Sequence, residues 1–252
     1  MKIDLNSDIG ESVDRSSTAS DEAVLECVTS ANIACGFHAG DPLTMRHTVE
    51  AAVRRGVSIG AHPSLPDLPG FGRREMSVTP AEARALVIYQ IGALAAFAHA
   101  AGTRLSHVKP HGALYNMAAR DAVLAEAIAQ AIVEVDAGLI LVGLASSELP
   151  TAGQRLGLRV AHEAFADRRY EADGRLSPRG EPGAVIDDID TAVAQALAIA
   201  IRGEATARTG ETLRIRADTL CVHGDRADAG EFARRLRRAL EASGVEVRAL
   251  KR

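Results

Sequence analysis

Strand-like and helix-like segments alternate along almost the whole chain of 252 residues, and this alternation limits the fold more than any other feature. Such alternation predicts a parallel sheet built from β/α units. Seven units in a chain of this length favour a closed, TIM-like barrel over an open doubly wound sheet, with 245–250 as a candidate eighth strand. The strand-like apolar runs lie at 2–8, 30–38, 57–62, 104–111, 138–144, 158–166 and 218–224.

Capping residues mark several helix boundaries. Residues 79–82, Thr-Pro-Ala-Glu, form a capping box with proline at the first helical position, which predicts a helix that ends at Gly102. Asp41-Pro42 predicts another helix, closed by Gly56. Further helical patterns run over 21–29, 119–136, 146–156, 189–202 and 228–243.

Three long connections interrupt this pattern. Residues 203–217 lack a helical period and predict a hairpin or a long loop, while 63–78 and 166–183 are rich in Pro, Gly and charge. Connections of this length inside a compact domain are usually functional or mobile. The sequence contains no low-complexity linker and no internal repeat, so we expect residues 1–252 to form a single domain.

Composition and charge narrow the function. The net charge of −4 argues against nucleic acid or an anionic membrane as the main partner, and an aromatic content of 3% argues against a base-stacking surface. The three cysteines have no CxxC spacing and the start has no signal-peptide core, so we expect a reduced, cytoplasmic protein. The apolar stretch 86–102 contains Gln90 and His99 and is shorter than the ~20 residues of a spanning helix, so we interpret it as a buried helix.

Polar side chains gather where the predicted strands end. The active site of a β/α barrel is built at the carboxyl ends of its strands. Side chains two apart in a strand share a face, so the polar residues of each strand point to the same side. The residues between them, Ile3, Leu5, Val108 and Val222, then face the helices. The groups that we expect to converge at one end are Asp4, Asn6, Asp8, Glu11, His38, His62, His107, Lys109, His111, Glu163, Asp167, Arg168, His223 and Asp225.

Some of these residues have an ordinary structural interpretation. A single histidine at a strand end is usually a hydrogen-bonded core residue, and we interpret His107 and His162 in this way; Asp225 fits a helix cap. Four other histidines finish four different strands: His38, His62, His111 and His223. As a set, beside several carboxylates and one lysine, they would be costly to bury without a role, so we expect a functional site.

Two kinds of chemistry fit such a site. Asp and His side chains can hold a divalent metal that activates water for amide or ester hydrolysis. The same groups can act without a metal, with a carboxylate or histidine as base and Lys109 or Arg168 stabilising an oxyanion. The spacing does not choose between them, since neither HExxH nor GxSxG occurs. No Gly-Lys dipeptide occurs either, which excludes a Walker A phosphate loop.

Seven runs of the sequence carry a family resemblance: DLNSDIGES (4–12), TSANIACGFHAGDP (29–42), IGAHPSLPDLPGFGRR (59–74), LVIYQIGAL (86–94), HVKPHGALYNMA (107–118), FADRRY (165–170) and ADTLCVHGD (217–225). They resemble the LamB/YcsF family, from about residue 2 to about residue 243. The resemblance implies an irregular seven-stranded β/α barrel of the glycoside hydrolase and deacetylase type. It also implies hydrolysis of 5-oxo-L-proline to L-glutamate with ATP and Mg²⁺ as co-substrate, together with two further subunits, B and C.

The resemblance also covers the strand-end residues above, except His107 and Glu163. We predict catalytic roles for Asp8, Glu11, His38, His62, Lys109, His111, Asp167 and His223. We predict substrate contacts for Asp4, Asn6, Tyr115, Arg168 and Asp225. If this chain binds a metal, we expect its ligands to be Asp8, His38, His62 and His111.

The mechanistic hypothesis is that phosphorylation of the lactam oxygen makes the ring carbon attackable by water. Lys109 and Arg168 would hold the substrate carboxylate or phosphate, and Asp8 or Glu11 would act as base. The strand-end histidines would position water, protonate the leaving nitrogen or hold a metal.

Two alternatives stay open: a stand-alone metal-dependent amidohydrolase or deacetylase, and a non-catalytic subunit that binds substrate. The run VDRSSTAS (13–20) departs from the family pattern after GES, so the resemblance does not cover that wall of the pocket. Ser7 also replaces a common cysteine.

Overall fold

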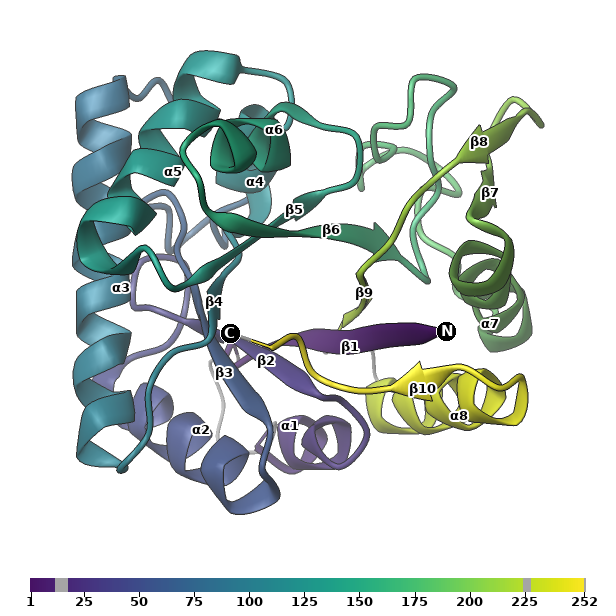
Figure 1. Cartoon of the computed structure of the whole chain (residues 1–252), viewed down its shortest axis with the longest axis horizontal. Coiled ribbons are helices and arrows are strands. Elements are labelled where there is room, and N and C mark those ends of the chain that lie inside the picture. Colours follow the sequence, from purple (N-terminus) through teal and green to yellow (C-terminus); the bar gives the residue numbers. More distant parts are fainter. Residues whose placement is uncertain (12–17, 224–227, 252) are drawn as a thin grey trace.

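Seven parallel strands form a closed barrel in this computed structural model, which describes residues 1–11, 18–223 and 228–251 (Figure 1). Each strand pairs with the next, and the last pairs with the first, with Asp4 opposite Thr219 and Asp8 opposite His223. The predicted barrel is confirmed. Its strands are β1 (Lys2–Ile9), β2 (Ser30–Ala34), β3 (Ser58–His62), β4 (His107–Val108), β5 (Ile140–Leu144), β6 (Arg159–Phe165) and β9 (Thr219–His223).

The candidate eighth strand adds to the barrel without entering its closure. Within 245–250, β10 (Glu246–Val247) pairs with Lys2 and Ile3, at the start of β1. From Asp4 onward β1 pairs with β9, so the barrel itself closes with seven strands. The 203–217 region forms an antiparallel hairpin of β7 (Glu204–Thr206) and β8 (Thr212–Arg214), as predicted.

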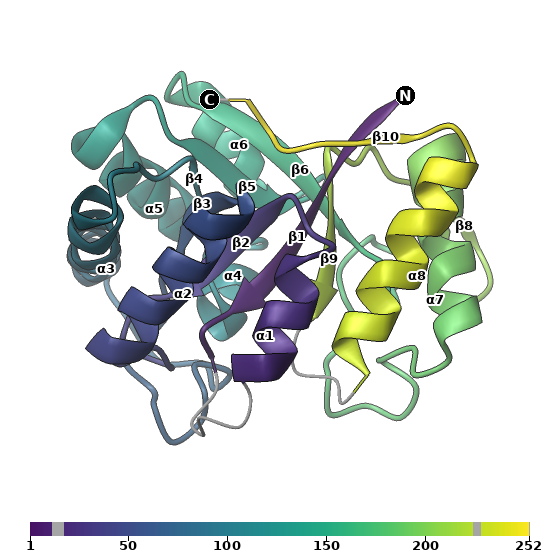
Figure 2. The same cartoon turned by 90° about the horizontal axis from the view of Figure 1, so that it is seen from below.

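Helices cover the outside of the barrel (Figure 2). The predicted capping box is present, since the Thr79 hydroxyl accepts from the Glu82 N–H and the Glu82 carboxylate accepts from the Thr79 N–H. Asp41 likewise caps its helix through the N–H of Leu43. The helices are α1 (Thr18–Leu25), α2 (Pro42–Arg55), α3 (Pro80–Ala100), α4 (Gly112–Ala118), α5 (Ala122–Asp136), α6 (Glu148–Arg155), α7 (Ile189–Leu197), which continues as a π-helical turn over Ala198–Arg202, and α8 (Ala229–Ala242).

Helix α3 is the one described helix long and apolar enough, by length and composition alone, to cross a membrane. It is longer than the apolar stretch identified in the sequence, because it begins at Pro80. One face, including Val87, Ile91 and Leu94, is buried in the main core. Gln90 is also buried, and it exchanges two hydrogen bonds of 2.8 Å with the backbone of Ser64. The opposite face, including Tyr89, is exposed, so the prediction of a buried helix holds for one face of α3 and not for the whole helix.

Two strands are shorter than predicted. After Ala34 the chain turns through Gly36 and Gly40, both at positive φ, so the run 30–38 stops being extended at its midpoint. After Val108 the chain enters α4 at Gly112, a helix that the sequence pattern did not predict. The N–H of Ala113 donates to the carbonyl of Gly72 at 2.8 Å, so a tertiary contact fixes the start of this helix.

The two faces of the strands differ sharply in polarity. Ile3, Leu5, Val108 and Val222 lie in the main hydrophobic core, as the alternation predicts. The other face carries mostly polar groups into the barrel interior. The apolar exceptions include Leu144 and Phe165 at the carboxyl ends and a small cluster of Ile140, Val142 and Ala161 that Leu250 covers. The interior is tightly packed: a Cβ on Gly60 would lie 2.1 Å from Nε2 of His107. This interior supports the floor of the functional site.

Candidate active site

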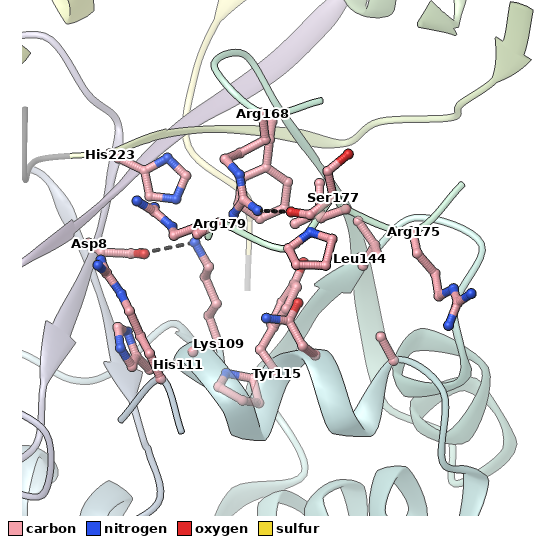
Figure 3. A pocket seen from close by; sticks show the side chains of 18 of the residues that line it. Asp8, Lys109, His111, Tyr115, Leu144, Arg168, Arg175, Ser177, Arg179 and His223 are labelled. Atoms are coloured by element: carbon pink, nitrogen blue, oxygen red, sulfur yellow. Dashed lines mark hydrogen bonds and ion pairs between the residues drawn. The ribbon is translucent and has the colours of Figure 1, made fainter. Parts of the chain in front are cut away.

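A cavity of about 660 Å³ lies at the carboxyl ends of the strands (Figure 3). Its volume is within the usual range for sites that bind small molecules. The residues that line it come from the ends of six strands, from α4 and from the connections 63–78 and 166–183. They include Asp8, Glu11, His62, Arg73, Lys109, His111, Tyr115, Leu144, Phe165, Arg168, Arg175, Ser177, Arg179 and His223.

Lys109 forms the centre of the cavity floor. Its Nζ lies 2.9 Å from Oδ1 of Asp8 and 2.8 Å from Oε1 of Glu163, with Asn6 Oδ1 at 3.3 Å and Cys221 Sγ at 3.2 Å. Burial opposes its charge, but Asp8, Cys221 and Glu163 raise the pKa of Lys109 well above its usual value. The lysine is therefore a fixed ammonium between two carboxylates.

Asp8 and Glu163 are each held by a further neutral donor. Burial would raise the pKa of Asp8, but the charges of His62 and Lys109 hold it well below its usual value. The Asn32 amide donates to Asp8 at 2.8 Å. The Tyr115 hydroxyl donates to Oε2 of Glu163 at 2.7 Å, and burial together with that carboxylate raises the pKa of Tyr115.

Asp4 and Asn6 lie beneath this floor and do not line the cavity. The Asp4 carboxylate accepts from the hydroxyls of Thr29, Ser30 and Thr219, and burial raises its pKa. The Asn6 amide donates to Glu163 at 3.0 Å. The two residues link β1 to β2, β6 and β9. They hold the floor in place, whereas the sequence analysis predicted substrate contacts for them.

Three histidine rings and Glu11 cluster at one wall of the cavity, where Glu11, His62 and His111 line it and His38 lies behind them. Oε1 of Glu11 lies 2.9 Å from Nε2 of His38, 3.0 Å from Nδ1 of His111 and 3.5 Å from Nε2 of His62. Burial lowers the pKa of His38 to about 4. Burial also opposes the charge of His62, but Asp8 and Glu11 raise its pKa. We call these four residues the His–Glu wall.

His223, at the end of β9, and Asp167, which follows β6, form a separate pair. Nδ1 of His223 donates to Oδ1 of Asp167 at 2.8 Å. Burial would raise the pKa of Asp167, but the charge of His223 and this hydrogen bond lower it. The carboxylate thereby orients the ring, and His223 itself lines the cavity.

Arginines form the remaining wall. Arg73, Arg168 and Arg179 line the cavity, and so do Arg120 and Arg175 near its rim. Arg168 is buried, and its Nη2 donates to the carbonyl of Ser177 at 2.5 Å (Figure 3). Its Nε is buried without a hydrogen-bond partner among the described residues. Burial and the nearby Arg179 lower the pKa of Arg168 to about 10. This arginine wall suits an anionic ligand.

The structure thus brings most of the predicted residues together. Asp8, Glu11, His62, Lys109, His111, Tyr115, Arg168 and His223 line the cavity, with His38 and Asp167 directly behind. Asp225 lies outside the described residues. His107 is a buried residue hydrogen-bonded to Asn32 at 2.8 Å, as interpreted from the sequence.

Several contributors to the site had no predicted catalytic or substrate role, among them Glu163, Arg73 and Arg179. Glu163 carried a clear signal, since strand alternation places it on the same face as Asp167. The two arginines lie in long connections, where the sequence pattern gives no orientation.

Within the described part of the chain, two groups of side chains present potential metal ligands. Glu11, His38, His62 and His111 direct four donor atoms to within 4.8 Å of one another. The predicted ligand set had Asp8 in place of Glu11; Asp8 instead lies beside the group, with Oδ2 3.3 Å from Nε2 of His62. The second group is Asp8, Cys221 and His223. There burial raises the pKa of Cys221 well above its usual value, which disfavours the thiolate that a metal needs.

Comparison with known proteins agrees with this architecture. The chain is 62% identical over 98% of its length to the A subunit of 5-oxoprolinase from Methylococcus capsulatus, covering 95% of that protein. It superposes with a TM-score of 0.92 on a lactam utilization protein from Thermus thermophilus, at 48% identity, covering 99% of this chain and all of the other. A family 4 carbohydrate esterase from Streptomyces lividans shares the fold at a TM-score of 0.51 and 12% identity, covering 99% of this chain and 93% of the esterase. The LamB/YcsF family model matches residues 3–252, and the chain belongs to that family.

Proposed function

We propose that this chain is the A subunit of an ATP-dependent 5-oxoprolinase, which hydrolyses the lactam of 5-oxo-L-proline to L-glutamate together with 5-oxoprolinase subunits B and C. The identity of 62% over 98% of the chain to the A subunit of a named 5-oxoprolinase carries this proposal. The charged cavity at the strand ends supports it, because a lactam acid offers one carboxylate and one amide to such a site.

The arginine wall would bind the anionic part of the substrate. Arg168 is the best placed member, because it is buried and Ser177 fixes its guanidinium. A buried guanidinium can make paired hydrogen bonds to a carboxylate or phosphate. Lys109 has a different part in this proposal. Its donors already contact Asp8, Glu163 and Asn6, so it fixes the two carboxylates and leaves anion binding to the arginines.

Proton transfer falls to Asp8 and His223. Ring opening adds the oxygen of water to the lactam carbon, breaks the C–N bond and delivers a proton to the nitrogen. Asp8 is ionised and lines the cavity, so it can accept a proton from water. His223 is oriented by Asp167 through Nδ1, so Nε2 is the atom that can donate to the departing nitrogen.

ATP and its Mg²⁺ would be bound by the partner subunits. The sequence has no Gly-Lys dipeptide and therefore no Walker A loop. In this arrangement the partners activate the lactam by phosphorylating its oxygen. Water then adds to the ring carbon and the C–N bond breaks, which leaves an acyl phosphate, and a second water releases inorganic phosphate to give L-glutamate.

The decisive experiment measures glutamate released from 5-oxo-L-proline by this chain and subunits B and C, singly and combined, with and without ATP and Mg²⁺. We expect glutamate only from the complete mixture with ATP. Arg168→Gln should suppress release, whereas Arg235→Gln, at an exposed arginine paired with Asp190, should not. Release by this chain alone would refute the three-subunit proposal.

The potential metal ligands of the His–Glu wall support one alternative function, a stand-alone metal-dependent amidohydrolase. This hypothesis predicts that the isolated chain hydrolyses 5-oxo-L-proline without ATP or partner subunits. The hypothesis of a non-catalytic subunit predicts that His223→Gln leaves glutamate release by the complex unchanged.

A further inference from the structure

The His–Glu wall gathers donor atoms from four separate segments of the chain. Glu11 follows β1, His38 follows β2, His62 ends β3 and His111 precedes α4. All three histidine residues are at most 4% exposed. The rings of His38 and His111 stack with their centroids 3.8 Å apart, and His62 meets His111 edge to face. Such a concentration of buried imidazoles requires a physical explanation.

The hydrogen bonds of two rings fix which nitrogen faces the centre. Nδ1 of His62 lies 2.7 Å from the carbonyl of Lys109, and Nε2 of His111 lies 2.9 Å from the carbonyl of Phe71. A carbonyl only accepts, so both of these nitrogens carry hydrogen. In the neutral rings, Nε2 of His62 and Nδ1 of His111 therefore present lone pairs to each other at 3.0 Å. Two facing lone pairs repel unless a proton or a metal ion lies between the rings.

Backbone anchoring of this kind is typical of metal-binding histidines. The partner of the distal N–H sets the tautomer and turns the other nitrogen toward the metal. The distances agree with a tetrahedral site. Ligand atoms at 2.0–2.1 Å from a tetrahedral metal are about 3.3 Å apart. The donor atoms of Glu11, His62 and His111 are 3.0, 3.0 and 3.5 Å apart. The His38 ring is stacked parallel on His111, so the two rings cannot share one ion in their planes; Nε2 of His38 instead donates to Glu11 at 2.9 Å and holds that carboxylate in place.

The loop that covers the wall holds these rings rigidly. Phe71 has φ +54°, unusual for a residue other than glycine, and its carbonyl is the acceptor for His111. Its ring packs edge-on against both His38 and His111. Gly72 also has positive φ, and a Cβ there would lie 2.1 Å from Oγ of Ser64 and 2.9 Å from Cβ of His38. The loop therefore fits closely only while the rings keep this arrangement.

We propose that Glu11, His62 and His111, with His38 supporting Glu11 from behind, form a binding site for one divalent transition metal ion of the zinc type. Two imidazole nitrogens and one carboxylate oxygen, with a fourth position open to the cavity, form a donor set that zinc prefers, whereas Mg²⁺ and Ca²⁺ prefer oxygen alone. Glu11, His62 and His111 line the cavity, so the bound ion faces the substrate. The proposal is independent of partner subunits and of the reaction.

The test is the metal content of the isolated full-length chain. The protein is stripped with chelator, incubated with a small excess of Zn²⁺, desalted and analysed by elemental mass spectrometry. We expect one equivalent in the parent protein and in His162→Gln, a control at a histidine whose ring contacts the Gln154 amide, away from the wall. Glu11→Gln and His111→Gln should each weaken zinc binding at least tenfold.

A second measurement covers the possibility that these variants fail to fold. Co²⁺ added to the stripped parent protein should give the intense visible absorption of a tetrahedral ion, and Zn²⁺ should abolish it. A folded parent protein that retains no Zn²⁺ and gives no such Co²⁺ spectrum would overturn the proposal; the close contact would then belong to a protonated His62. Because neither readout uses turnover, failure here leaves the proposed 5-oxoprolinase role untouched.

Discussion

Replacing Lys109 by methionine tests whether the lysine ammonium offsets the free-energy cost of burying the Asp8 and Glu163 carboxylates in the cavity floor. The side chain is buried, and its Nζ lies within 3 Å of carboxylate oxygens of both Asp8 and Glu163. Methionine has a similar length and keeps most of the packing. The substitution therefore removes a charge and leaves the volume nearly constant.

The cost follows from the two carboxylates that remain. Removing one partner of a buried ion pair costs about 3–5 kcal/mol, because the other charge stays buried without compensation. The protein can limit this cost only by protonating a carboxyl group. Holding a carboxyl of ordinary pKa protonated at pH 7 costs roughly 4 kcal/mol, at 1.4 kcal/mol per pH unit. Whether the carboxylate stays charged or becomes protonated, the free energy of unfolding falls by a similar amount. That loss is a large part of the stability of an ordinary domain.

The same reasoning fixes the sign of the pH dependence. A carboxyl that is protonated in the folded variant and ionised in the unfolded chain means that the folded state binds the extra proton. Stability then falls as pH rises. Relative to the parent protein, Lys109→Met should lose about 1.4 kcal/mol per pH unit between pH 5 and pH 7.

Urea unfolding followed by circular dichroism at pH 5, 6 and 7 measures these quantities. Adding Glu163→Gln to Lys109→Met replaces one carboxylate by a neutral amide of similar shape, which should return about 2–4 kcal/mol at pH 7. It should also flatten the pH dependence. A loss below about 1 kcal/mol for the single variant, or no recovery in the double variant, would refute the reasoning.

Three further predictions concern stability. Burial raises the pKa of Asp21 from 3.8 to about 6, so its charge is unfavourable at neutral pH. Asp21→Asn keeps an acceptor for the Gly10 N–H and should stabilise by about 1–2 kcal/mol at pH 7, after allowance for solvent screening, but not at pH 3. Gly60→Ala places a Cβ against the His107 ring and should cost about 2–3 kcal/mol in urea unfolding, whereas Gly92→Ala, an open helical position, should stabilise by about 0.5–1 kcal/mol. Thr79→Ala removes the capping box and should lower the free energy of unfolding by about 1 kcal/mol.

The barrel could be predicted because its strands have strong local signals. Leu5, Val108 and Val222 alternate with polar residues, and this period-two pattern indicates both the strand and the side of the barrel that each residue faces. The helix that begins at Pro80 was marked by its own capping residues. By contrast, α4 starts where Gly72 accepts a hydrogen bond from Ala113, a contact between residues 41 positions apart. No local pattern encodes such a contact.

The sequence predicted which residues lie in the functional site, but it did not predict which of their side chains contact one another. Strand alternation indicates that His62, Lys109 and Glu163 face inward, but it cannot indicate which side chain pairs with which. Depth along the strand decides that question. Asp4 shares a face of β1 with Asp8 but comes four residues earlier in the strand, farther from the carboxyl ends where the cavity lies. There its carboxylate accepts hydrogen bonds from the hydroxyl groups of neighbouring side chains.

Asp8 links the two charged groups of the site through its two carboxylate oxygens. Oδ1 accepts from Lys109 at 2.9 Å, and Oδ2 lies 3.3 Å from Nε2 of His62. A cation bound at the His–Glu wall would take the lone pair of His62 and bring a second positive charge close to Asp8. That charge adds to the effect of Lys109 and holds the carboxylate ionised. The adjacency of the two groups therefore means that occupancy of the wall acts directly on the carboxylate proposed as the base.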